Sequence, residues 1–130
     1  MASVSTNLLI PFIAGSQNNK EITFNSAIDA LDEALCGNTS EAITATTFTL
    51  GSTDFLGNLF FKFTGTISPS LGCTVTLPTG IAKLFIVLND LTNMNPMTFE
   101  VGTNVADVVI SDSTPHLMYS DGVGNVYKIS

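Results

Sequence analysis

The spacing of hydrophobic and polar positions changes along the chain, from that of a helix to that of strands. Within residues 25–36, Ile28, Leu31 and Leu35 recur three and four residues apart, with acidic residues largely off their line. This spacing places them on one narrow apolar stripe and predicts one short α-helix. An isolated helix of this length is marginal in water, so its stripe requires a partner surface.

Residues at both ends of this segment suit helix termini. Asn25 or Ser26 can cap the N-terminus, because a short polar side chain accepts a hydrogen bond from the first free backbone N–H groups. Gly37 follows the last apolar position, where a glycine in the left-handed conformation commonly ends a helix. The sequence therefore predicts a helix that begins near Asn25 and ends before Gly37.

From residue 42 onward the hydrophobic period is two, which is typical of β-strands. The segment 84–88 is apolar on both faces, which favours a central strand, and Asp121–Gly124 has the composition of a hairpin turn. Short strands with turn residues between them predict a β-sandwich or jelly-roll-like domain. The alternating segments are residues 42–50, 59–64, 73–77, 84–88, 97–101, 105–110, 116–120 and 125–129.

The first 24 residues predict an extended arm. Pro11 interrupts their apolar cluster, and proline disfavours a helical conformation at the residue before it. The cluster is too short to fold alone, so the arm packs against its own domain or against a neighbouring molecule. We therefore expect a mainly β chain, with the arm and helix in residues 1–40 and a β-sandwich knob in residues 41–130.

Composition excludes several classes of function. The chain has 4 Lys, no Arg and 11 Asp or Glu, for a net charge of −7, whereas proteins that bind nucleic acid or anionic membranes present clustered basic residues. We expect no membrane span and no secretory signal, because no long apolar run and no basic N-terminal segment is present. Only 12% of the residues are charged, and 12 Ser, 17 Thr and 11 Asn make the chain polar, which suits a protein held in an assembly.

Residues capable of catalysis do not form a recognisable pattern. His116 is the only histidine, and no serine or cysteine stands in a nucleophile motif, so we expect an exposed or hydrogen-bonded structural histidine. Asp29, Asp32 and Glu33 are interpreted as the solvated face of the helix, not as catalytic carboxylates. We therefore expect no enzymatic activity, and a small glycan-active enzyme is the alternative from that class.

Metal and cofactor sites are likewise not expected. Cys36 and Cys73 lack the CxxC spacing and the nearby histidine of a zinc site, and we interpret them as reduced, partly buried thiols, with a single disulfide as the alternative. The segment Asp121–Asn125 offers oxygen ligands for Ca²⁺ but lacks the acidic spacing and the closing Glu of a calcium loop. A glycine-rich hairpin turn is the favoured interpretation.

One predicted strand carries large apolar side chains on both of its faces. Phe60 and Lys62 share one face, whereas Phe61 and Phe63 share the other. One face belongs to the core, and large apolar residues on the other mark a protein interface more often than a free surface. Three copies of the helix stripe can meet around a threefold axis. The predicted interface of a homotrimer comprises Ile28, Leu31, Leu35 and Phe60.

Two parts of the sequence resemble a known class of proteins. The opening is similar to that of phage-encoded virion proteins, which reads approximately as a leucine-proline segment, a Gln-x-x-Lys-Glu-Val/Ile-Thr-x-Asn core and an Ala-x-x-x-Leu-Asp helix. It is carried here by Asn7–Pro11, Ala14–Asn25 and Ala27–Asp32. Segments of the second half resemble β-domains of phage head and tail appendages, namely Phe63–Thr66, Val75–Pro78, Leu84–Asn89 and Met118–Gly122. Fibre proteins with such modules are commonly longer, which favours a small accessory protein of the capsid.

The resemblance implies a structural protein of a bacteriophage virion, a capsid decoration or cement protein that stabilises the head shell. Its partner would be the major capsid protein, on the surface of the phage head, with assembly in the cytoplasm of the bacterial host. The alternative is a knob of a head fibre or tail fibre that binds a glycan receptor. The arm would attach the protein to the capsid. The predicted attachment residues are Leu8, Leu9, Ile10, Phe12, Gln17 and Asn18.

Overall fold

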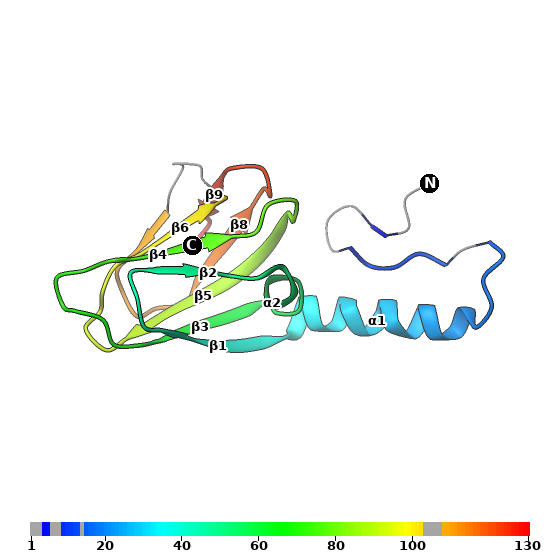
Figure 1. Ribbon diagram of the computed structural model, residues 1–130, viewed down its shortest axis with the longest axis horizontal. Helices are drawn as coiled ribbons and strands as arrows, with labels where there is room; N and C mark the ends of the chain where they lie inside the picture. Colours follow the sequence, from blue (N-terminus) through cyan, green and yellow to red (C-terminus); the bar gives the residue numbers. More distant parts are fainter. Residues whose placement is uncertain (1–3, 6–8, 14, 103–107) are drawn as a thin grey trace.

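The protein consists of a long helix followed by a β-domain (Figure 1). The computed structural model describes residues 4–5, 9–13, 15–102 and 108–130. It is mainly β, as predicted. The elements are α1 (Lys20–Cys36), β1 (Asn38–Ile43), β2 (Thr47–Thr49), α2 (Ser52–Leu56), β3 (Phe60–Gly65), β4 (Cys73–Leu77), β5 (Lys83–Leu91), β6 (Met97–Val101), β7 (Val108–Ile110), β8 (His116–Ser120) and β9 (Val126–Lys128).

Two sheets form the β-domain, which confirms the predicted two-sheet fold. Their strand orders are β1-β3-β5-β8-β9 and β2-β4-β6-β7. From β1 to β6 the chain alternates between the sheets, and successive strands within each sheet pair in parallel. The remaining pairs, β5–β8, β6–β7 and β8–β9, are antiparallel. In the first half of the domain the chain therefore winds from one sheet to the other and back, so that each turn adds a parallel strand to each sheet. Antiparallel strands complete both sheets. This connectivity differs from the antiparallel Greek keys of a jelly roll.

The predicted alternation of buried and outward residues is confirmed on the central strands. Phe61 and Phe63 of β3 are fully buried, whereas Phe60 and Lys62 lie outward and are half-buried. The core joins the sheets, since the rings of Phe63 and Phe99 meet with centroids 5.6 Å apart. The strand predicted to be central is β5, the third of five strands in its sheet.

Several predicted boundaries are wrong. The helix begins at Lys20, not at Asn25, and Asn19 precedes it in the left-handed conformation. Neither Asn25 nor Ser26 is therefore a cap, because both lie inside α1. Gly37 ends the helix in an extended conformation, with φ −64° and ψ 147°, not in the left-handed one. Residues 20–24, which were predicted to belong to the extended arm, are thus part of the helix.

Other differences concern the strands. The segment 42–50 contains the end of β1 and all of β2, and β1 begins at Asn38, inside the region assigned to the arm and helix. The short helix α2 was not predicted. Of the predicted strand 105–110, residues 105–107 lie outside the described residues and 108–110 form β7. The hairpin turn at Asp121–Gly124 is confirmed, because it joins the antiparallel strands β8 and β9.

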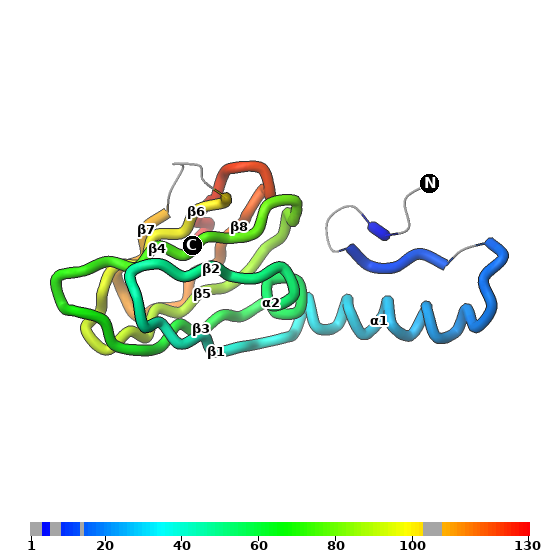
Figure 2. Tube along the Cα trace, in the orientation of Figure 1, coloured from blue at the N-terminus to red at the C-terminus, as the bar shows by residue number. Residues whose placement is uncertain are grey.

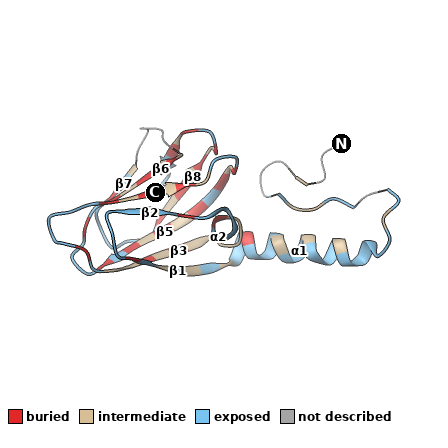
Figure 3. Cartoon of the chain, in the orientation of Figure 1, coloured by how far each residue is buried: buried red, intermediate tan, exposed pale blue. Residues whose placement is uncertain are grey.

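The helix α1 projects from one end of the β-domain, and the arm runs back beside it (Figures 1 and 2). Within α1, all of which is described, Ala34 is the single buried residue, so most of the helix surface faces solvent (Figure 3). Two described segments of the arm pair with each other. The amide N–H of Ser5 donates to the carbonyl of Ile10 at 2.8 Å, and Val4 forms an isolated antiparallel bridge with Pro11.

Candidate functional site

The longest uncovered apolar surface of the helix is a stripe that we call the helix seam: Phe24, Ile28, Leu31 and Leu35. Their exposed fractions lie between 37% and 57%. The intervals of four, three and four residues are those of the a and d positions in a coiled coil. The predicted residues Ile28, Leu31 and Leu35 thus share one exposed face. Phe24 was missed because the helix was expected to begin one residue after it.

The residues beside the helix seam favour close approach of another helix. Ala27 and Ala34 follow one side of the seam and Asn25 and Asp32 the other, by helical spacing. Small side chains at such flanking positions let two helix backbones come near each other. The neighbouring Asp29 lies further round the helix. Like charges therefore do not line the seam on both sides.

Near the β-domain, the helix seam runs into an apolar groove of about 480 Å³ on the five-stranded sheet. Leu35 belongs to both features. Phe60, predicted to share an interface with the helix stripe, is not among the groove residues, although its cross-strand partner Ile86 is. We call this feature the outer groove. It is lined by Ala34, Leu35, Leu59, Ala82, Lys83, Leu84, Ile86 and Leu117.

The predicted attachment residues that the structure describes differ in exposure and in hydrogen bonding. Leu8 lies outside the described residues. Leu9 and Phe12 are exposed, at 42% and 52%, and Leu9 faces a shallow pocket that also involves Ala30 of α1 and Leu56 of α2. That pocket lies on a different face of α1 from the helix seam, because Ala30 is off the seam.

The other attachment residues are more polar or better bonded. Ile10 is half-buried, and its N–H donates to the Ser5 hydroxyl at 2.9 Å. The Gln17 amide donates to the hydroxyl of Thr23 in α1, which ties the end of the arm to the first turns of the helix. Asn18 is exposed. The arm therefore presents Leu9 and Phe12 to solvent, while Gln17 anchors it.

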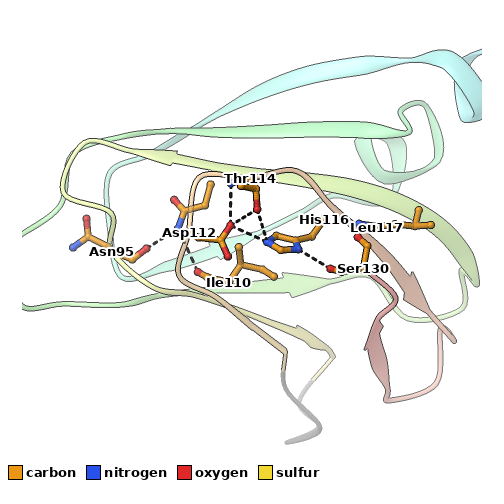
Figure 4. Close-up of polar contacts among 8 residues, drawn as sticks. Asn95, Ile110, Asp112, Thr114, His116, Leu117 and Ser130 are labelled. Carbon is orange, nitrogen blue, oxygen red and sulfur yellow. Dashed lines mark hydrogen bonds and ion pairs between the residues drawn. The ribbon is translucent and has the colours of Figure 1, made fainter.

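The single histidine belongs to a hydrogen-bonded cluster at the end of the chain (Figure 4). The Asp112 carboxylate lies 2.9 Å from His116 Nε2 and accepts hydrogen bonds from the Thr114 N–H and hydroxyl. These bonds from Thr114, and then that from His116, hold the pKa of Asp112 well below its usual range. His116 Nδ1 lies 2.7 Å from the carbonyl oxygen of Ser130. The buried His116 thus fastens the last residue to the preceding loop.

The carboxylate of Asp121 stabilises the turn between β8 and β9. One of its oxygens accepts the backbone N–H groups of Val123, Gly124 and Asn125, each within 2.9 Å, and the other accepts the Asn125 side-chain amide. These bonds hold the pKa of Asp121 well below its usual range, the bond from Gly124 first. Both oxygens serve the turn, which supports the hairpin interpretation over a calcium loop.

The two cysteines are free thiols in different environments. Cys36 is exposed at the end of α1, which differs from the partial burial expected for it, and Cys73 is buried in the core. Burial raises the pKa of the Cys73 thiol. The alternative of a disulfide between the two is therefore wrong.

Comparisons with models of protein families, with curated proteins and with solved structures find no match to this chain. Among the described residues, no three His, Cys, Asp or Glu side chains gather as they would around a metal ion. Nor does either helix in this part of the chain have the length and apolar content needed to cross a membrane. The helix seam, the outer groove and the arm are the features whose exposed apolar side chains bear on function.

Proposed function

We propose that the chain is a structural protein of a bacteriophage virion, a capsid decoration or cement protein that binds the major capsid protein and stabilises the head shell. The observation that carries the proposal is the helix seam: four large apolar side chains at coiled-coil spacing on a helix that projects from the domain. A monomer gains nothing from exposing such a stripe, whereas an assembly covers it. The location is the surface of the phage head, after assembly in the cytoplasm of the bacterial host.

The helix seam supports a homotrimer. Three parallel copies of α1 can bury their a and d side chains around a threefold axis. Ile28, Leu31 and Leu35 form the centre of this contact, and Phe60 lies further along the same molecule on the outward face of β3. Seventeen helical residues allow about two heptads, which is short for an independent coiled coil. The β-domain therefore adds contacts to those of the helix.

The arm supports attachment to a protein shell. Residues 1–19 contain no Asp, Glu, Lys or Arg, so the arm can lie on a capsid surface without desolvating a charged side chain. Its exposed apolar side chains, Leu9 and Phe12, supply the burial that would offset ordering of the segment. Amide side chains such as Asn18 can pair with exposed backbone groups.

The proposal is tested by removing the arm. Deletion of residues 2–16 is expected to leave a folded protein that no longer decorates phage heads, measured by cryo-electron microscopy of particles assembled with and without the deletion. Phe12→Ser is expected to lower occupancy severalfold, whereas Val109→Ser, at an equally exposed apolar position on β7, leaves it unchanged. Unchanged occupancy after the deletion would assign attachment to another surface. Absence of the wild-type chain from the head would contradict the decoration function.

One observation favours the second candidate, a head-fibre or tail-fibre knob that binds glycans. Tyr119 and Tyr127 are cross-strand neighbours on β8 and β9, with ring centroids 6.4 Å apart and planes 27° apart, and Tyr127 is half-exposed. Exposed aromatic rings are the usual platform for a sugar ring. This function predicts density at a single vertex or on the tail, and a loss of glycan binding in Tyr127→Ala.

A further inference from the structure

The two sheets of the β-domain have outward faces of opposite character. On the four-stranded sheet the outward positions are mostly threonine, as in β2 and at Thr74, Thr76 and Thr98. Threonine is well suited to a strand that faces water on one side. On the five-stranded sheet the outward positions of β5 and β8 are apolar instead, except for Asp90 near the end of β5. The apolar ones are Leu84, Ile86, Leu88, Leu117 and Tyr119.

This apolar face is nearly free of charge, although the chain carries a net charge of −7. On the outward positions of β1, β3, β5 and β8, all fully described, the charged side chains are Lys62 and Asp90. They form an ion pair with each other, at 3.0 Å between Lys62 Nζ and an Asp90 carboxylate oxygen. Two copies can therefore bring these faces together without the repulsion that the remaining acidic surface would cause.

The outer groove connects this face to the helix seam. Leu35 ends the seam and also lines the groove, together with Leu84 and Leu117 of the sheet. Because β1 starts two residues after α1 ends, the helix runs on nearly in line with its sheet (Figure 1). Copies that align their helices along the seam would therefore bring their five-stranded sheets next to one another.

The helix alone offers too little area for a stable contact. A standard interface covers roughly 800 Å² on each partner. The four half-exposed side chains of the helix seam supply roughly 300–500 Å². The outer groove and the sheet face beside it are the apolar surface that continues the seam, so a larger contact would extend onto them.

We infer that the outer groove and the adjoining outward face of β5 and β8 form a second interface between copies of this chain, continuous with the helix seam. The occupant of the groove is the corresponding face of a neighbouring copy. This inference rests on the trimer in the proposed function and adds the sheet to it.

Cross-linking of the full chain tests the inference. In a Cys36→Ser background, Leu84→Cys places an exposed thiol at the groove, and the remaining native thiol, Cys73, is buried. A short bis-maleimide is expected to link Leu84→Cys chains to one another in most of the protein at micromolar concentration. Val109→Cys is the matched control, since Val109 is 53% exposed on the opposite sheet and Leu84 is 48% exposed. The control is expected to give at least fivefold less product.

Light scattering provides the second measurement. Leu84→Asp is expected to raise the concentration for half-dissociation at least tenfold, whereas Val109→Asp leaves it within twofold of wild type. Circular dichroism establishes that each variant is folded, and Leu84→Ser replaces Leu84→Asp if the acidic variant is not.

The outcomes separate the inference from the proposed function. If Leu84 variants behave like the Val109 controls while the wild type is oligomeric, the groove is not an interface, and the decoration function with its helix contact stands. If the wild-type chain is a monomer at 100 µM, the inference and the trimer are both overturned. If the copies cross-link at Leu84 but the protein is missing from phage heads, the inference stands and the decoration function fails.

Discussion

A single buried lysine shows how the strands and the short helix depend on each other. Lys83 lies at the start of β5 on its inward side, with 7% of its surface exposed. Its ammonium donates to the carbonyl oxygens of Phe55 at 2.7 Å and Asn58 at 2.6 Å, and lies 5.2 Å from the centroid of the Phe55 ring. These bonds satisfy carbonyl groups at the end of α2. Burial lowers the pKa of Lys83 to about 8.

This shift predicts a rise in stability with pH. Between about pH 8 and the ordinary lysine pKa of 10.5, the unfolded chain holds a proton at Lys83 that the folded chain has released. The free energy of unfolding that depends on Lys83 therefore increases across this window, by about 1–3 kcal/mol. We expect the difference in unfolding free energy between wild type and Lys83→Met to grow from pH 7.5 to pH 10, measured by urea denaturation.

The subtraction removes the contributions of all other groups, such as the buried thiol of Cys73, because they are common to both proteins. Lys62→Met is the control, since Lys62 is partly exposed and paired with Asp90. Its difference from wild type should stay constant with pH. A difference for Lys83→Met that is flat or falls with pH would show that the buried ammonium keeps its proton throughout.

Sequence patterns could not identify Lys83 as buried. The predicted strand begins at residue 84, and a lysine next to an alternating run normally faces water. Its burial depends on acceptor carbonyls 28 and 25 residues away, one in α2 and one in the segment just after it. By contrast, the inward phenylalanines of β3 were predictable, since alternation alone fixes which side chains share a face.

At the level of elements, the helix was predicted over residues 25–36, and its first five residues, 20–24, were missed. Thr23 and Phe24 favour strands, and Asn25 and Ser26 have the chemistry of caps, so local preference places the start too late. The longer helix gives the seam a fourth member, Phe24. With Phe24 included, the apolar residues of the seam follow the alternating spacing of four and three residues that is typical of the a and d positions in a coiled coil.

The helix seam predicts the behaviour of helix variants. At micromolar concentration, light scattering of the wild-type protein is expected to give three chain masses. Leu31→Ser removes a central apolar side chain from the seam and should raise the concentration for half-dissociation at least tenfold. Ile22→Ser is the control, since Ile22 is 59% exposed but lies off the seam. Equal effects of the two substitutions, or a monomeric wild type, would contradict a contact through the seam.

For the whole molecule, the strands were predictable and their pairing was not. Residues paired in parallel are 22 apart between β1 and β3, as for Asn38 and Phe60, but 26 apart between β3 and β5, as for Phe60 and Ile86. The winding of the chain between the two sheets therefore repeats in space, but its turns do not have a fixed length in the sequence. Alternation assigns side chains to faces, but it does not name the partner strand.

The outer groove was beyond sequence reasoning for the same reason. Leu35, Leu59, Leu84 and Leu117 are separated by 24 to 33 residues, and only the alternation of the chain between two sheets brings them together. Phe60, which was predicted to lie in an interface, does face outward from its sheet. The residues of the sheet that continue the helix seam could be identified only once the fold was known.

The placement of the core predicts that the β-domain is a folding unit of its own. The core cluster runs from Ile43 to Val126 and includes no described residue of the arm and none of α1, whose single buried residue, Ala34, lies outside it. A chain that starts at Gly37 keeps the carbonyl that accepts the N–H groups of Leu59 and Phe60, at 2.8 and 3.1 Å. Deletion of residues 2–36 therefore removes little of what stabilises the sheets.

We expect this truncated protein to unfold cooperatively as a monomer, with a Tm that does not change with protein concentration. The Tm of the full chain should rise with concentration, because association stabilises the folded state by mass action. On dilution it should approach that of the truncated protein to within about 5 °C, the shift that roughly 1 kcal/mol produces in a domain of this size. Calorimetry over a hundredfold range of concentration measures both. A truncated protein that lacks a cooperative transition would mean that α1 is part of the folding unit, and the helix would then be a structural element of the domain before it is an interface.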